Sequence, residues 1–347
     1  MSRDKALREL WFTRCPVPTA TGIAHALGWL NQEFSPDGIQ VATIQDAPPE
    51  LSRHHYDHEI TSLIREGGSL LALAARAQGA PTRLIGLTWI DEAQAIIVRP
   101  GSGITEPRHL NGARVALPRY VQRDITAHVR GSSIARGMSL HGIKGALSLA
   151  GLSLDAVEFV EVGSGQQERG SQNLGELWAG LDGLTTGAVD AVYVKGASAV
   201  EAAQRRGLTV GIDLDQFPDR RARVNNGTPR PITVHESLLE THFDLVVRFL
   251  AQTLRAADWA KDNLQAVYDI LKRETRAGDA GVTAAYRDGF HRNLHPDLSA
   301  ERLDLLRIQK TFMWVHGFLD ADFDLARWVD ARPLAAAQQL LLHREVA

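Results

Sequence analysis

Short apolar runs alternate with longer segments of helical periodicity along most of the chain. Apolar and β-branched runs bounded by polar residues predict strands at 10–12, 39–44, 83–89, 95–98, 114–117, 156–162, 191–194 and 209–213. Apolar residues at three- and four-residue spacing predict helices at 21–31, 69–78, 133–150, 174–186, 196–206, 235–263, 264–277, 283–290 and 300–317. This alternation is typical of an α/β fold with mostly parallel sheets.

The order of these segments predicts two domains. A chain of 347 residues exceeds the size at which a single hydrophobic core usually stops growing. A new strand begins near 114 after a loop rich in glycine and proline, and a purely helical tail follows the strand at 209–213. We therefore expect a first α/β domain of residues 1–114 and 209–347, and an inserted second α/β domain of residues 115–208. The chain then passes between the two domains twice, which predicts an interdomain cleft, where such folds bind ligands.

Charge and composition exclude several classes of partner. The chain has 38 Lys and Arg against 41 Asp and Glu, so it lacks the basic field that would bind nucleic acid or an anionic membrane. No apolar run is long enough to insert into a membrane. The charged first residues lack the apolar core of a secretory signal, so we expect a cytoplasmic protein, or a periplasmic one if a leader has been removed. One cysteine permits no intramolecular disulfide.

That single cysteine, Cys15, stands in the stretch "ELWFTRCPVPTA", directly after a strand-like run. Pro16 disfavours helical geometry at the preceding residue, so the thiol is expected at the carboxyl end of a strand, where clefts open. A neighbouring histidine or arginine would lower the thiol pKa from about 8.5 and raise the thiolate fraction. The alternative interpretation is a small buried hydrophobic residue.

A second stretch, "HYDHEITSLIREGG", places His55, Arg65, Gly67 and Gly68 close together in sequence. The arginine fork matches paired oxyanion oxygens, and a helix that begins after the glycines would present its amides to an anion. The glycines could instead form only the turn that starts this helix.

Other histidines compete with His55 for a role in this stretch. His54 and His58 are its neighbours, and together with Asp57 they could bind a metal. We expect no metal site, because an irregular loop does not hold ligands in a fixed geometry.

Several stretches resemble known families. The segments "ITEPRHLNGARVAL", "GAVDAVYVKGASAVEAAQRRG" and "HESLLETHFDLVVRFLAQTLRAADWAKDN" look like the type II periplasmic solute-binding-protein fold, in its branch of sulfonate and nitrate binders. The stretches around Cys15 and His55 resemble the 2'-hydroxybiphenyl-2-sulfinate desulfinase family. This resemblance implies Cys15 as the catalytic thiol, His55 as its assistant, Arg65 as the anchor of the sulfinate and the Gly67–Gly68 pair as part of the anion site, with Gly68 as a backbone donor.

The resemblance implies an aromatic sulfinate desulfinase, a hydrolase that cleaves a C–S bond and releases sulfite without a metal or organic cofactor. Either a thiolate attacks the sulfinate sulfur, or a thiol delivers a proton to the ring carbon. In the stretch aligned with an aromatic wall of the family's pocket, this chain carries Met138, Ser139 and Leu140, so the aryl group is expected to differ.

Two other functions stay open at this stage. The first is a solute-binding protein for a sulfonate or another small organic anion, with an ABC importer permease as its partner. The second is a relative of thiamine-pyrimidine synthesis, which shares the fold; the single cysteine argues against it, because that group carries a cysteine-rich iron-binding motif.

Overall fold

The computed structural model describes residues 7–13, 16–119, 134–163, 178, 180–287 and 289–346. The strands in these residues form three sheets, ordered β2-β1-β3-β10-β4, β8-β5-β9 and β6-β7. The strands are β1 (Glu9–Phe12), β2 (Gln40–Thr43), β3 (Leu63–Glu66), β4 (Thr82–Thr88), β5 (Gln94–Val98), β6 (Arg114–Pro118), β7 (Glu158–Val162), β8 (Val192–Lys195), β9 (Thr209–Asp213) and β10 (Arg230–His235).

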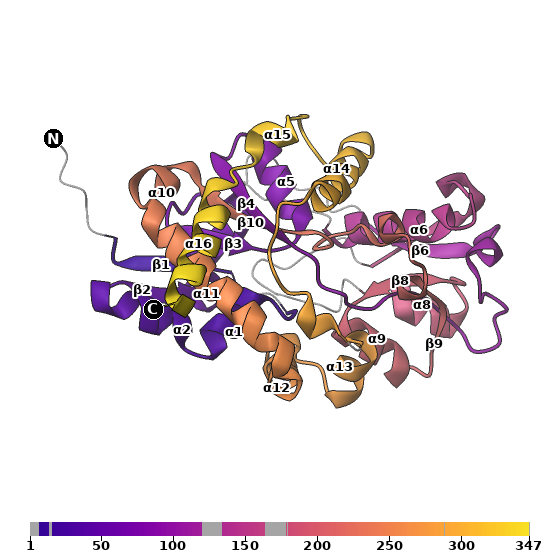
Figure 1. The fold of residues 1–347 in the computed structure, drawn as a ribbon. Helices are drawn as coiled ribbons and strands as arrows, with labels where there is room; N and C mark the ends of the chain where they lie inside the picture. The colour runs from indigo at the N-terminus through magenta and orange to yellow at the C-terminus, as the bar shows by residue number, and fades with distance from the viewer. Residues whose placement is uncertain are drawn as a thin grey trace.

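Helices cover both groups of strands (Figure 1). They are α1 (Ala20–Ala26), α2 (Trp29–Phe34), α3 (Pro49–Ser52), α4 (His54–Asp57), α5 (Ser69–Ala77), α6 (Ile134–Ser148), α8 (Gly180–Thr186), α9 (Ala197–Arg205), α10 (Glu236–Thr241), α11 (Phe243–Asp262), α12 (Leu264–Thr275), α13 (Asp279–Ala285), α14 (Ala300–Val315), α15 (Leu325–Trp328) and α16 (Arg332–Val346). Among the described residues, no helix combines the length and the apolar character that crossing a bilayer requires.

The five-stranded sheet is mixed rather than mostly parallel, which corrects the expectation from the sequence. Strand β1 is parallel to β2 and β3, whereas β10 runs antiparallel between β3 and β4. The start of β10 therefore lies at the same edge of the sheet as the carboxyl ends of β1, β3 and β4. This edge gathers residues from segments that are far apart in the sequence.

The second group of strands lies at the other end of the molecule, on the right in Figure 1. Strand β5 is antiparallel to both β8 and β9, and the Ala116 amide donates to the Ala191 carbonyl at 3.0 Å, which joins β6 to the β8 edge. The predicted boundaries at 114/115 and 208/209 stay a prediction. The pairing of β5 and β9 with β8 favours a second unit that includes residues 94–98 and 209–213.

One hydrophobic cluster runs through both groups of strands. It packs α1, α11 and α16 against the five-stranded sheet, where it includes Leu10 and Phe12, and it continues to Val192 and Val194 of β8. A separate cluster fills the rest of the second group, where Ile96, Val115 and Tyr193 are buried. Helix α11 has one apolar face, as its sequence periodicity predicts, and that face lies against α1 and α16.

Two predicted helices are interrupted in the structure. The segment 21–31 is broken at Gly28, whose φ of 76° is left-handed, so α1 ends there and α2 begins. The segment 235–263 is broken at His242, whose non-helical backbone separates α10 from α11.

Other elements were not predicted from the sequence. Strands β3 and β10 contain buried charges or proline within short runs, and helix α16 carries charged residues among its apolar ones. Trp314 on α14 is 45% exposed, whereas Trp328 on α15 is buried.

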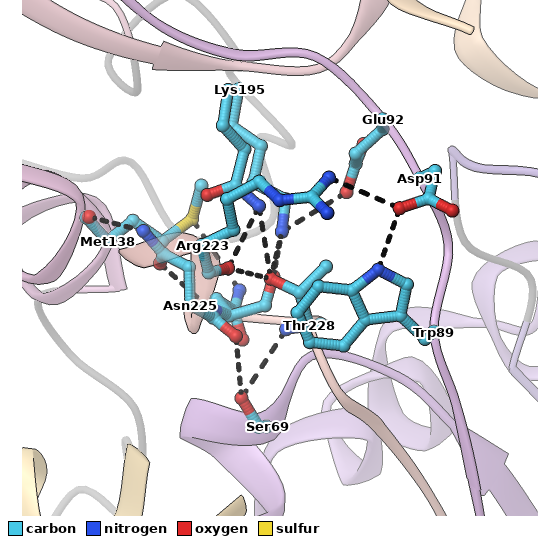
Figure 2. A network of polar contacts seen from close by, with 12 residues as sticks. Ser69, Trp89, Asp91, Glu92, Met138, Lys195, Arg223, Asn225 and Thr228 are labelled. Carbon is cyan, nitrogen blue, oxygen red and sulfur yellow. Dashed lines mark hydrogen bonds and ion pairs between the residues drawn. The ribbon is translucent and has the colours of Figure 1, made fainter. Parts of the chain in front are cut away.

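A buried lysine of the second group, paired with Glu92, binds the segment that leads into β10. The Lys195 ammonium, at the end of β8, lies 3.3 Å from a Glu92 carboxylate oxygen and donates to Thr228 Oγ1 at 3.0 Å and to the Asn226 carbonyl at 3.1 Å. Figure 2 shows Lys195, Glu92 and Thr228 in this network. Burial lowers the pKa of Lys195, and Glu92 opposes this shift. Lys195 of the second group thus holds the chain segment that leads into β10.

We expect this pair to be strongly coupled. Lys195→Met leaves the Glu92 carboxylate buried without its partner and should lower the free energy of unfolding by about 3–5 kcal/mol. Glu92→Gln should also destabilise the protein, and the double variant should lose at least about 1 kcal/mol less than the sum of the single losses. Urea denaturation measures all three variants. Lys261→Met, which removes an exposed pair with Asp258, is the control and should cost less than about 1 kcal/mol. Additive losses at Lys195 and Glu92 would contradict the coupling.

Candidate functional site

Polar residues gather at the sheet edge where β1, β3 and β4 end and β10 begins. Thr13, directly after β1, donates its hydroxyl to the Glu66 carbonyl at 2.6 Å, and Thr88, at the end of β4, donates to Glu66 Oε1 at 2.9 Å. Arg230 is the first residue of β10 and pairs in register with Thr88. Buried polar side chains from four strands therefore meet at one place.

Arg65 is the central residue of this edge, and its side chain is almost wholly buried, at 1% exposure. Its Nε donates to the His55 carbonyl at 3.4 Å, and both terminal nitrogens donate to the Gly68 carbonyl at 3.3 Å. The structure therefore brings together three of the residues that the sequence singled out.

Neighbouring side chains lie so close to Gly67 and Gly68, after β3, that neither position has space for a Cβ atom. A Cβ at Gly67 would lie 2.6 Å from the Arg65 Cζ, and a Cβ at Gly68 would lie 2.2 Å from the Asn226 Oδ1. The Gly67 amide donates to the Pro231 carbonyl at 3.2 Å, so it is engaged at the sheet edge. Gly67 as a substrate-binding residue stays a prediction, and the structure gives it a steric reason for being glycine.

A segment from a distant part of the sequence supports the start of helix α5. The Asn226 Oδ1 accepts from the Leu70 amide at 3.1 Å, and the Ser69 hydroxyl donates to the Asn225 carbonyl at 3.3 Å. The Asn225 side chain in turn donates to the Met138 carbonyl at 2.9 Å (Figure 2). Sequence reasoning missed both asparagines, and their only signal was the Asn226–Gly227 dipeptide, which is typical of a turn.

Met138, which was expected to replace an aromatic wall, lies close to these residues. Its Sδ is 3.5 Å from the Asn226 Nδ2, and the residue is buried. Because Asn226 also lies against Gly68, helix α6 of the second group brings Met138 near the predicted anion site. The thioether offers an adaptable apolar contact in place of a flat ring.

His55 lies on helix α4, within a segment that the sequence suggested was an irregular loop. Its Nδ1 is inaccessible to solvent and makes no hydrogen bond with another described residue. Burial lowers the His55 pKa to about 3, with further contributions from the positive charges of Arg65 and Arg230. The imidazole is therefore neutral at physiological pH, and its lowered pKa makes it a weak base.

The neighbouring histidines have different partners. His54 Nδ1 lies 2.8 Å from Asp57 Oδ1, and His58 ends α4 in a left-handed conformation with φ of 61°. His54, Asp57 and Glu59 each offer a ligand atom, all within 4.8 Å of one another, instead of the set His54, Asp57 and His58 considered from the sequence. The hydrogen bond between His54 and Asp57 brings these groups together, and it stabilises the short helix α4.

Cys15 lies outside the described residues, so its predicted role stays a prediction. Its described neighbours are informative, because Thr13 is hydrogen-bonded to the residue that follows Arg65. Strands β1 and β3 are parallel, with Phe12 paired to Ile64. The chain therefore approaches position 15 from the same sheet edge that holds Arg65.

We expect Gly68→Ala to disturb the site through sterics alone. The backbone φ of −54° suits alanine, but the new methyl group would displace the Asn226 amide from the Leu70 amide that it caps. The variant should lose about 1–3 kcal/mol of stability in urea denaturation, and adding Asn226→Ala should recover part of this loss. If the double variant is less stable than Gly68→Ala, the clash with Asn226 is not the reason that position 68 requires glycine.

The chain is similar to curated relatives and to solved structures over most of its length. The chain is 25% identical to the 2'-hydroxybiphenyl-2-sulfinate desulfinase of Rhodococcus erythropolis, in an alignment that covers 98% of this chain and 96% of the relative. A cysteine-to-serine mutant of the desulfurization enzyme DSZB, in complex with biphenyl-2-sulfinic acid, has the same fold with a TM-score of 0.76. It is 23% identical over 96% of this chain and 100% of that one. The periplasmic aliphatic sulphonate binding protein SsuA of Escherichia coli has a TM-score of 0.65, at 14% identity over 93% of this chain and 92% of its own.

These neighbours confirm the expected two-domain α/β fold of the type II periplasmic-binding-protein class. A family model, described as NMT1/THI5 like, matches residues 19–266 and so spans both groups of strands. The chain belongs to the NMT1/THI5-like family.

Proposed function

We propose that this protein is an aromatic sulfinate desulfinase that cleaves the C–S bond and releases sulfite. The observation that carries the proposal is the buried contact of Arg65 with both His55 and Gly68, which gathers an anion anchor and a neutral imidazole beside the segment that leads to Cys15. The full-length similarity to curated desulfinases supports the same chemistry.

The proposed substrate is an aryl sulfinate with one negative charge. Arg65 supplies positive charge in a site from which water is largely excluded, where electrostatic attraction is stronger than in solvent. The amide of Gly68 is the proposed second donor, as the family resemblance implies. Together they would hold the sulfinate oxygens and leave the sulfur facing position 15.

The lowered pKa of His55 bears on the choice between the two routes. It makes the imidazole a weak base, so the route in which the Cys15 thiol delivers its proton directly to the ring carbon is favoured. The ring carbon keeps the C–S electrons, and the sulfur leaves as SO2. Water hydrates the SO2 to sulfite and releases a proton, which restores the thiol, while His55 orients the thiol by accepting a hydrogen bond from it. Attack of a Cys15 thiolate on the sulfinate sulfur is the other route, and it uses the same residues.

The alternative function is a binding protein for a sulfonate or a similar organic anion. The sulphonate-binding neighbours share the fold, and the Arg65 site would suit such an anion equally well. Turnover separates the two functions, because a binding protein would retain a sulfonate and release no sulfite from a sulfinate. The cytoplasmic location stays a prediction under either function.

A sulfite-release assay on phenyl, biphenyl and hydroxybiphenyl sulfinates tests the proposal. The wild type should release sulfite from at least one of them. Cys15→Ser should lower kcat by more than about a thousandfold, and His55→Gln by about 10²–10⁴-fold. His109→Gln changes an exposed histidine outside the site and serves as the control, with unchanged activity. Absence of sulfite with every substrate, or full turnover by Cys15→Ser, would refute the desulfinase function.

The pH dependence of kcat/KM tests the state of His55. Because burial and two arginines lower its pKa from 6.5 to about 3, the imidazole stays neutral as the pH falls from 7 to 5. We therefore expect no acid limb with an apparent pKa between 6 and 7. A loss of activity centred near pH 6.5 in the wild type, absent in His55→Gln, would show that His55 titrates normally.

A further inference from the structure

Glu66 is a buried residue whose carboxyl group has no part in the proposed chemistry. It is the last residue of β3, directly after Arg65, and it is 1% exposed. Its backbone carbonyl accepts from the Thr13 hydroxyl at 2.6 Å, and its carboxyl group accepts from the Thr88 hydroxyl at 2.9 Å. Burying a carboxyl group is costly, so packing alone does not explain this residue.

The Glu66 carboxyl group also contacts the start of helix α1. It forms a hydrogen bond with the side chain of Thr21, in the first turn of that helix. The Thr21 Oγ1 in turn lies 3.2 Å from the Thr253 Oγ1 of α11. Thr19 caps the same helix by accepting from the Gly22 amide at 2.9 Å. The three threonines are buried, so polar contacts from β3 and α11 hold the start of α1 in one position.

Glu66 therefore contacts the chain on both sides of Cys15. Thr13 lies before Cys15 in the sequence and Thr21 lies after it. Strand β1 is paired in register with β3, and Val17, between the two threonines, is buried. One residue of β3 thus holds both ends of the short segment that carries the thiol, and it is the neighbour of the arginine that would anchor the anion.

The direction of these hydrogen bonds assigns a proton to Glu66. A hydroxyl has one proton to donate, and Thr253 donates its own to the Phe249 carbonyl at 3.1 Å. Thr21 therefore donates to Thr253, and the Thr21 oxygen accepts from the acid of Glu66. Burial raises the pKa of Glu66, which favours the same neutral acid. A glutamine side chain has the same pattern, because it accepts at one terminal atom and donates at the other.

We propose that Glu66 and Thr13 are positioning residues, which hold the two ends of the Cys15 segment so that the thiol faces an anion bound at Arg65. Neither residue contacts the substrate, and each acts through the backbone beside Cys15. This inference rests on the proposed desulfinase function and adds two residues to its site. A misplacement of about 1 Å at a reacting group costs about 10²-fold in rate, so the loss of one of these contacts should be measurable.

Matched variants separate the polar groups from their shapes. Thr13→Val keeps the shape of the side chain and removes the proton that the Glu66 carbonyl accepts, whereas Thr13→Ser keeps the hydroxyl. Glu66→Leu removes the side-chain hydrogen bonds, and Glu66→Gln keeps them. Thr275→Val is the control, because Thr275 is also buried and donates to the Leu271 carbonyl at 2.8 Å, but it lies on α12.

Alkylation of Cys15 tests the inference without turnover. Cys15 is the only cysteine of the chain, so the reaction of the whole protein with iodoacetamide reports this thiol alone. Benzenesulfonate at about 20 times its Kd should slow the alkylation of the wild type about tenfold or more, because the bound anion covers the thiol. This protection should fall below about threefold in Thr13→Val and Glu66→Leu, and it should persist in Thr13→Ser, Glu66→Gln and Thr275→Val.

Binding and turnover complete the test. Calorimetry should give every variant a Kd for benzenesulfonate within about threefold of the wild type, since Arg65 is unchanged. In the sulfite-release assay, Thr13→Val and Glu66→Leu should lower kcat by about 10–100-fold and change KM less than about threefold. A residue that only stabilised the fold would not produce this split between kcat and binding.

Several results would overturn the inference. One is a wild type that benzenesulfonate does not protect; another is Thr13→Val with the protection and kcat of Thr13→Ser. An equal loss of protection in Thr275→Val, or Glu66→Gln as impaired as Glu66→Leu, would also overturn it. Failure of the wild type to release sulfite, with the expected pattern of protection, would refute only the desulfinase function. Sulfite release without any difference among the variants would refute only the inference.

Discussion

The buried guanidinium of Arg65 is the constraint on which the site depends. It holds the carbonyls of His55 and Gly68, which come from opposite sides of β3 in the sequence. Its position leaves no space for a side chain at Gly67, and its charge helps to keep His55 neutral. A lysine at this position would keep the charge but would not provide the fork that donates to two carbonyls. One side chain thus fixes the shape and the charge of the site and helps to keep His55 neutral.

The site is also tied to the second group of strands. The segment 225–228 contacts helix α5 through Asn226, helix α6 through Asn225, and β8 through Lys195. These contacts are buried and polar, so a change in the position of either group of strands would alter the start of helix α5. A ligand at Arg65 therefore touches a region whose geometry both groups of strands determine. The same segment leads directly into β10 and to Arg230.

The sequence predicted most of the fold because apolar periodicity dominates its strands and helices. Strands β3 and β10 escaped prediction for a physical reason: each contributes a buried arginine to the site, and β10 also contains Pro231. His55, Arg65 and Gly68 were recognisable because they lie within one short stretch. Arg230 and Asn226 were not, because an isolated arginine or asparagine in a sequence usually lies at the surface. Only the antiparallel insertion of β10 between β3 and β4 brings them to this edge.

The most direct measurement of the central claim is a crystal structure of the Cys15→Ser variant soaked with benzenesulfinate. The account predicts sulfinate oxygens within about 3.2 Å of the Arg65 guanidinium or the Gly68 amide. It also predicts that the sulfur faces the side chain at position 15, with the His55 imidazole beside it. A sulfinate bound away from Arg65, or a side chain at position 15 that points away from the sulfur, would contradict the account.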